Sequence, residues 1–174
     1  LITLILVSVS LALVFLLEEP TLLGIDDANI FFVYAQNFSS GHGFVYNIDG
    51  GRVEGFTSFL WMMLGVFFFI VSDTPELSLL ILNISLITAA LTAFSLVLDQ
   101  RLQIVTRSGQ HHSFLPIMTF FWILWIFSNP SYPIWTILTL MDTGLWCTVL
   151  ISGLILSINF IYSKNLTPSQ NIPF

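Results

Sequence analysis

The sequence contains few charged residues, and this scarcity decides the class of protein. Only 8% of its 174 residues are charged, whereas a soluble domain has about 25%. Hydrophobic residues make up 56%, and the mean hydropathy is +0.92, so we expect an integral membrane protein. Four basic residues against ten acidic ones are too few for a nucleic-acid-binding surface. One cysteine, Cys147, excludes a disulfide framework within the chain.

Strand patterns are also missing, because the apolar residues come in runs rather than in alternation with polar ones. Backbone groups in lipid must be hydrogen-bonded within their own segment, so these runs predict helices. The predicted fold is an all-α polytopic bundle that forms one membrane domain over residues 1–174. Its predicted spans are residues 1–17, 56–72, 77–98, 114–128 and 144–162.

A further apolar piece at residues 131–143 is short and contains Pro133. Irregular backbone at membrane depth persists only where it lines a cavity walled by protein. We therefore interpret this piece as a re-entrant or interfacial segment.

The basic residues conflict with a simple count of the spans. If the N-terminus starts in the cytoplasm and both 56–72 and 77–98 cross, Arg101 lies outside, against the positive-inside rule. A single net crossing over this region would satisfy the rule. It would also place Asp142 on the same side as Asp26.

The longest polar interruption, residues 18–55, is patterned rather than random. It contains the adjacent acids Asp26 and Asp27, and ionisable groups beside a bilayer often mark functional sites. Apolar residues then recur at helical spacing, which predicts an amphipathic helix over 27–39 along the membrane surface. These residues are Ile30, Phe31, Tyr34, Ala35 and Phe38. Turn residues follow at 39–43 and 47–51.

The string DDANIFFVYAQN, followed by GHGFVYN and RVEGFTSFLW, resembles the first extracytoplasmic loop of the GT-C superfamily of membrane glycosyltransferases. It is most similar to the bacterial branch of terminal arabinofuranosyltransferases, and the resemblance covers residues 26–61. Val33 departs from it, because relatives commonly carry an arginine there. A weaker resemblance places Asp142 where relatives carry an acid after a proline-broken segment, so Asp142 is a candidate substrate-binding residue.

The resemblance implies the N-terminal part of a larger GT-C module in the bacterial inner membrane, with its active site on the extracytoplasmic side. The donor would be a polyprenyl-phosphate-linked sugar, and the acceptor an envelope glycan, lipid or protein. The polar ending at 163–174, with no further span, agrees with a chain that forms only part of such a module.

A donor of this kind carries its own leaving group, so the enzyme mainly has to deprotonate the acceptor hydroxyl. By its match to the first acid of the family motif, Asp26 is the expected general base. Asp27 would orient it, share its proton or hold a divalent cation, and two neighbouring carboxylates raise the pKa of one of them. The plainer alternative is that both acids cap a helix, which is compatible with catalysis.

Four more residues of the loop are candidates for substrate binding. Arg52 is its only basic residue and would pair with the lipid phosphate, or else with Glu54 or Asp49. Glu54 would line the acceptor groove or cap the next helix. His42 would contact substrate or face solvent in a turn, and Tyr46 would stack on a sugar or anchor the loop at the membrane boundary.

The alternative function is that of a non-catalytic polytopic membrane protein, such as an inactive paralogue or an assembly partner. It would share the apolar composition. It has no reason to keep paired acids, an amphipathic helix and a glycine-rich return in this order, which favours the enzyme.

Overall fold

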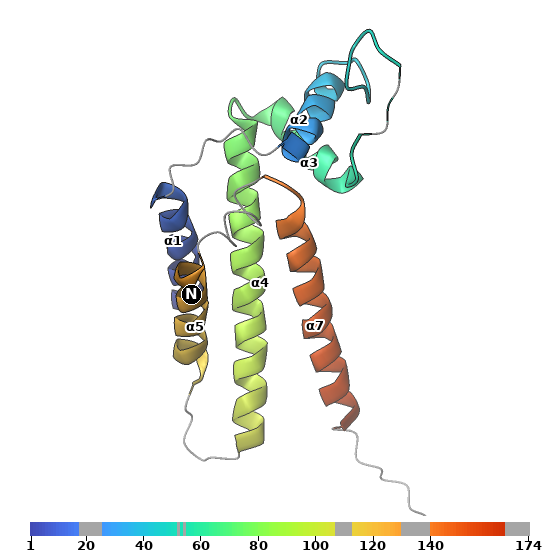
Figure 1. Cartoon of the computed structure of the whole chain (residues 1–174). Helices are drawn as coiled ribbons and strands as arrows, with labels where there is room; N and C mark the ends of the chain where they lie inside the picture. Colours follow the sequence, from blue (N-terminus) through green and yellow to red (C-terminus); the bar gives the residue numbers. More distant parts are fainter. Residues whose placement is uncertain (18–25, 52, 54, 107–112, 130–139, 166–174) are drawn as a thin grey trace, which may run out of the picture.

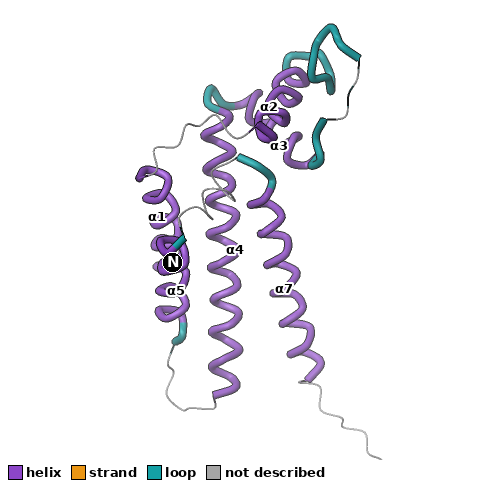
Figure 2. Tube along the Cα trace, viewed as in Figure 1, coloured by secondary structure: helices purple, strands orange, loops and turns teal. Residues whose placement is uncertain are grey.

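The computed structural model describes residues 1–17, 26–51, 53, 55–106, 113–129 and 140–165 (Figure 1). They form six helices: α1 (Ile2–Leu17), α2 (Asp26–Ser39), α3 (Phe59–Val71), α4 (Pro75–Thr106), α5 (Leu115–Ser128) and α7 (Thr143–Asn165). No strand occurs within these ranges, as Figure 2 shows, so the prediction of an all-helical chain is confirmed.

Two of the described helices are long and apolar enough to cross a membrane. A span needs about 20 residues, because a helix rises about 1.5 Å per residue and the hydrocarbon core is about 30 Å thick. The apolar part of α4 covers Pro75–Gln103 and that of α7 covers Thr143–Ser163. The predicted spans 77–98 and 144–162 fall on these two helices, and the other three fall on the shorter apolar helices α1, α3 and α5.

The helices α4 and α7 run side by side in the same direction. Asn83 of α4 donates a hydrogen bond to the Met141 carbonyl, with an N···O distance of 3.1 Å. Near the other end of both helices, Arg101 donates to the Asn159 side chain at 2.5 Å. Each pair is separated by 58 residues, so the register is constant along the contact.

The helices α1 and α5 lie together against α4 (Figure 1). Their first turns meet where the hydroxyl of Thr119 donates to that of Thr3 at 2.9 Å, so they run parallel. The indole of Trp122 on α5 donates to the Ser95 hydroxyl on α4 at 2.9 Å. Polar bonds and small residues specify helix contacts in apolar bundles, where lipid is as apolar as the helices themselves.

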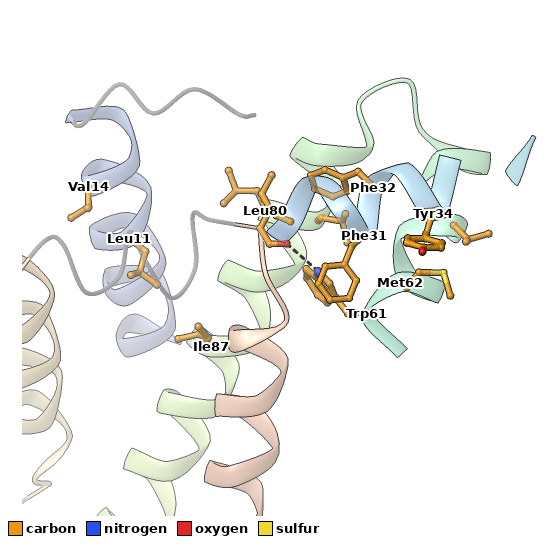
Figure 3. Close-up of a cluster of buried hydrophobic side chains, with 14 of the residues drawn as sticks. Leu11, Val14, Phe31, Phe32, Tyr34, Trp61, Met62, Leu80 and Ile87 are labelled. Carbon is orange, nitrogen blue, oxygen red and sulfur yellow. Dashed lines mark hydrogen bonds between the residues drawn. The ribbon is translucent and has the colours of Figure 1, made fainter. Parts of the chain in front are cut away.

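The helices α2 and α3 form a compact pair at one end of the bundle. The buried residues of α2 and α3 include Tyr34, Ala35, Trp61 and Met62, and Figure 3 shows three of these side chains gathered between the two helices. Gly65 lets the helices approach closely, since a Cβ there would lie 3.1 Å from that of Ala35. We call this end, where α4 and α7 also begin, the α2–α3 end.

The short helix α3 does not run along the bundle. It packs against α2 and the first part of α4, so residues 59–106 pass along the bundle once, by way of α4 (Figure 1). Arg101 therefore lies toward the opposite end, whereas Met141 and Asp142, just before α7, lie at the α2–α3 end. A single passage of this region is the arrangement that would satisfy the positive-inside rule.

Two predicted features fall partly or wholly on residues that are not described. The predicted re-entrant segment at 131–143 is described only from residue 140 onward. Arg52 and Glu54 lie outside the described residues.

The range of the predicted amphipathic helix, 27–39, lies within α2, Asp26–Ser39.

Replacing Gly144 by Ala should weaken the contact between α4 and α7. An added Cβ would overlap the side-chain oxygen of Asn83 and lie 2.9 Å from its Cγ. We expect a loss of about 1 to 3 kcal/mol, the usual cost of overpacking. Thermal unfolding in detergent would measure it. In the matched control Gly153→Ala, the new Cβ meets nothing within 4 Å, so an equal loss in both variants would contradict this account.

Candidate functional site

The predicted catalytic pair stands at the start of α2. Asp26 and Asp27 are the first two residues of this helix, where negative charge is favoured by the helix dipole. The structure describes their backbone, and their side chains lie outside the described part. Asp26 precedes Ile30 by four residues, which is about one helical turn. Groups that surround Ile30 are therefore close to the start of the helix.

Two glycines reverse the chain after α2. Gly41 has a φ of +85° and Gly43 a φ of +81°, in the left-handed region that favours glycine. His42 lies between them with an exposed side chain, and its backbone N–H donates to the Asn37 carbonyl at 2.9 Å. This is the position that the plainer interpretation expects of His42, a histidine in a solvent-facing turn.

Asn37 attaches the returning chain to α2. Its side-chain amide donates to the carbonyls of Val45 and Tyr46, at 2.8 and 3.0 Å. A tight turn follows, in which the Gly50 N–H donates to the Asn47 carbonyl at 3.1 Å. The return is therefore held by side-chain and backbone hydrogen bonds in place of a strand ladder.

Aromatic rings fill the space between α2 and this return. Phe38 stacks on Phe44 with centroids 4.2 Å apart. Tyr34, which is fully buried, packs against Phe56 at 5.0 Å and Tyr46 at 5.9 Å. The Tyr34 hydroxyl donates to the backbone carbonyl of Val53 and so secures the second half of the loop.

Two cavities lie beside this cluster. The larger has a volume of about 350 Å³ and lies between α2 and the return. The smaller, about 150 Å³, reaches from α2 to Met141, which precedes α7. Ile30 and Gly55 line both cavities, so the two are neighbours. Residues of the loop that carries the resemblance thus line one cavity together with Met141.

The segment before α7 is held in an uncommon backbone conformation. Leu140 is fully buried and has a φ of +60°, a left-handed conformation that costs a leucine about 1 to 3 kcal/mol. Its carbonyl accepts a hydrogen bond from the Trp61 indole at 3.0 Å, drawn as the dashed line in Figure 3. Asn83 binds the next carbonyl, that of Met141. Side chains from two helices, α3 and α4, therefore hold this junction.

Asp142 is buried at this junction, with 9% of its surface exposed. One carboxylate oxygen accepts from the Trp146 indole at 2.9 Å, and its backbone carbonyl accepts from the Trp146 N–H at 3.0 Å. Because α7 begins at Thr143, the carboxylate also stands at the positive end of that helix. These contacts are those of a residue that stabilises the start of α7. Asp142 directly follows Met141, which lines the smaller cavity.

The structure brings some of the predicted site residues together and separates others. Tyr46 lines the larger cavity, and Asp142 adjoins a residue that lines the smaller one. His42 lines neither of the two. Sequence reasoning missed Asn37 and Leu140, which hold the walls of the site. No local pattern marked Asn37, because the carbonyls that it binds approach it only after the chain has reversed.

Changing Asn37 to Asp should loosen the return while leaving α2 in place. The carboxylate keeps the shape of the amide but cannot donate, so two carbonyl contacts become repulsive. We expect a local loss of about 1 to 3 kcal/mol and faster chymotrypsin cleavage after Phe44 or Tyr46. Asn29→Asp is the control, since Asn29 is exposed on the same helix. Equal cleavage rates in the two variants would refute the role assigned to Asn37.

The arrangement can support acid–base chemistry on a bound ligand, because acids at a helix start stand one turn from the edge of a cavity. Among the described residues, no group of three or more His, Cys, Asp or Glu could hold a metal ion. Comparisons with protein-family models, curated proteins and solved structures found no match to this chain.

Proposed function

We propose that this chain belongs to a polytopic membrane glycosyltransferase of the GT-C type. It would transfer a sugar from a polyprenyl-phosphate donor to a glycan, lipid or protein acceptor of the cell envelope. One observation carries the proposal. The segment that resembles the first GT-C loop, residues 26–61, contributes residues that line two cavities, and Ile30 at their edge lies one turn from Asp26.

The distribution of charge supports an orientation in the bacterial inner membrane. Arg101 lies toward the end of the bundle opposite α2 and α3, and Lys164 belongs to the last turn of α7 at that same end. By the positive-inside rule this end faces the cytoplasm, and the α2–α3 end faces outward. Acidic residues of the α2–α3 end are Asp26, Asp27, Asp49, Asp73, Glu76 and Asp142.

The surface of α7 supports its place in lipid. Only 6% of its apolar part is buried, against 44% for α4, so most of α7 needs an apolar surrounding. Large side chains are exposed along its whole length: Trp146, Val149, Leu150, Leu154, Leu156, Phe160 and Ile161. Acyl chains satisfy such a surface, whereas water would make it prone to aggregation.

In the proposed reaction Asp26 is the general base. Its carboxylate takes the proton of an acceptor hydroxyl while the oxygen of that hydroxyl forms a bond to the anomeric carbon of the donor sugar. The bond from this carbon to the phosphate oxygen breaks, and the polyprenyl phosphate leaves with the electron pair. Asp27 holds Asp26 in position or binds a divalent cation, and Arg52 pairs with the departing phosphate.

The orientation can be tested by labelling cysteines in a Cys147→Ser background. We expect a membrane-impermeant maleimide, added to intact spheroplasts, to label Asp49→Cys and to leave Ser113→Cys unlabelled. Both positions are exposed, and they lie at opposite ends of the bundle. Permeabilised cells should label both. The reverse pattern in intact spheroplasts would refute the orientation and with it an outward-facing site.

The base can be tested by Asp26→Asn in the full-length protein. Labelled polyprenyl-phosphate-linked hexoses and pentoses would be supplied with envelope glycan fragments, and the transferred sugar measured. We expect transfer to fall by at least about 100-fold, because an amide cannot take the proton, while membrane insertion is unchanged.

The matched control is Asp49→Asn in the exposed turn after Asn47, which should transfer normally. Equal turnover of Asp26→Asn and the wild type would remove Asp26 from this role. If the wild type transfers sugar from no donor of the panel, the chain is better explained as a non-catalytic assembly partner.

A further inference from the structure

The reaction proposed above leaves open which group occupies the larger cavity of the α2–α3 end. Its volume of about 350 Å³ is near the lower limit for pockets that bind small molecules, which is about 300 Å³. A single ring therefore fits it better than a nucleotide or a long acyl chain. Its lining residues are Ile30, Tyr34, Tyr46, Asn47, Gly51, Val53 and Gly55.

The lining combines an aromatic wall with an amide. Tyr46 has 43% of its surface exposed, so its ring remains accessible in the cavity wall, whereas Tyr34 is fully buried behind it. Asn47 presents one group that both donates and accepts hydrogen bonds. An aromatic face beside an amide suits a ligand with apolar faces and hydroxyl edges.

Hydrogen bonds attach the wall of the cavity to α2. Asn37 binds the carbonyls of Val45 and Tyr46, and the Tyr34 hydroxyl binds the Val53 carbonyl. Both sides of the cavity are thus fastened to α2. A prearranged wall lowers the ordering cost of binding, so a small ligand can be held by few contacts.

The cavity also lies at a suitable distance from the acids. Ile30 is at its edge, and Asp26 precedes Ile30 by four residues, or about 6 Å along the helix axis.

We propose that this cavity binds one sugar ring, with Tyr46 stacked on its apolar face and Asn47 bonded to a hydroxyl. The inference rests on the proposed function for the role of that ring as a substrate. The ring belongs either to the acceptor or to the donor, and both share this chemistry.

Binding can be measured without any transfer. Saturation-transfer difference NMR would use the full-length protein in detergent micelles with methyl α-mannopyranoside and methyl α-arabinofuranoside as probes. We expect both probes to bind the wild type with no donor present. Tyr46→Ala should lower affinity about tenfold, and Tyr46→Phe, which keeps the ring, should preserve it.

A second variant fills the cavity rather than removing its wall. Gly51 lines the cavity, and a Cβ there meets nothing within 4 Å, so Gly51→Leu should fold normally and exclude the probes. Gly153→Leu on α7, also with open space around its Cβ, is the control and should bind as the wild type does. Unfolding temperatures equal to that of the wild type would verify that Gly51→Leu is intact.

The outcomes separate this inference from the proposed function. Binding that depends on Tyr46 and Gly51 supports the sugar site even if no donor is turned over. If transfer occurs, an increase in KM for the acceptor alone assigns the ring to the acceptor, and an increase for the donor alone assigns it to the donor. Unchanged probe binding and unchanged KM values in Tyr46→Ala and Gly51→Leu would overturn the inference and leave the transferase proposal intact.

Discussion

The buried hydrogen bond from the Trp61 indole to the Leu140 carbonyl connects the α2–α3 pair to the chain just before α7. A buried carbonyl without a partner would cost about 1 to 3 kcal/mol, and the left-handed backbone of Leu140 adds strain. The indole provides this carbonyl with a hydrogen-bond donor, and this bond offsets part of the strain in the backbone of Leu140. Through this contact, the loop that carries the paired acids and the segment that carries Asp142 share one end of the bundle.

The bundle below this junction is held in register by a few polar contacts. Lipid offers apolar side chains nearly the same surroundings as another helix does, so burial alone specifies a helix contact weakly. Asn83 and Arg101 determine how α4 lies on α7, and Thr119 determines how α5 lies on α1. Gly144 adds the steric requirement, because only a residue without a Cβ fits against Asn83. The same passage of α4 carries Arg101 away from the acidic end.

Local patterns predicted the elements of the site well. The helical spacing of apolar residues after Asp27 predicted the range of α2, and the glycines around His42 predicted the turn that follows. The role of Asn37 could not be predicted, because its partners are backbone carbonyls of residues that approach only after the chain has reversed. The conformation of Leu140 escaped prediction for a related reason, since leucine normally avoids positive φ and local sequence gives no sign of it.

The sequence by itself determined that the described residues form helices. Its apolar residues come in runs long enough for helices and do not alternate with polar residues as strands require. It also determined where the acids stand along the chain. Only the tertiary structure decided that α3 stays beside α2 instead of running along the bundle, and that Met141 lines a cavity together with Ile30. Those outcomes depend on contacts between residues far apart in the chain, such as Trp61 with Leu140, and no local pattern records such pairs.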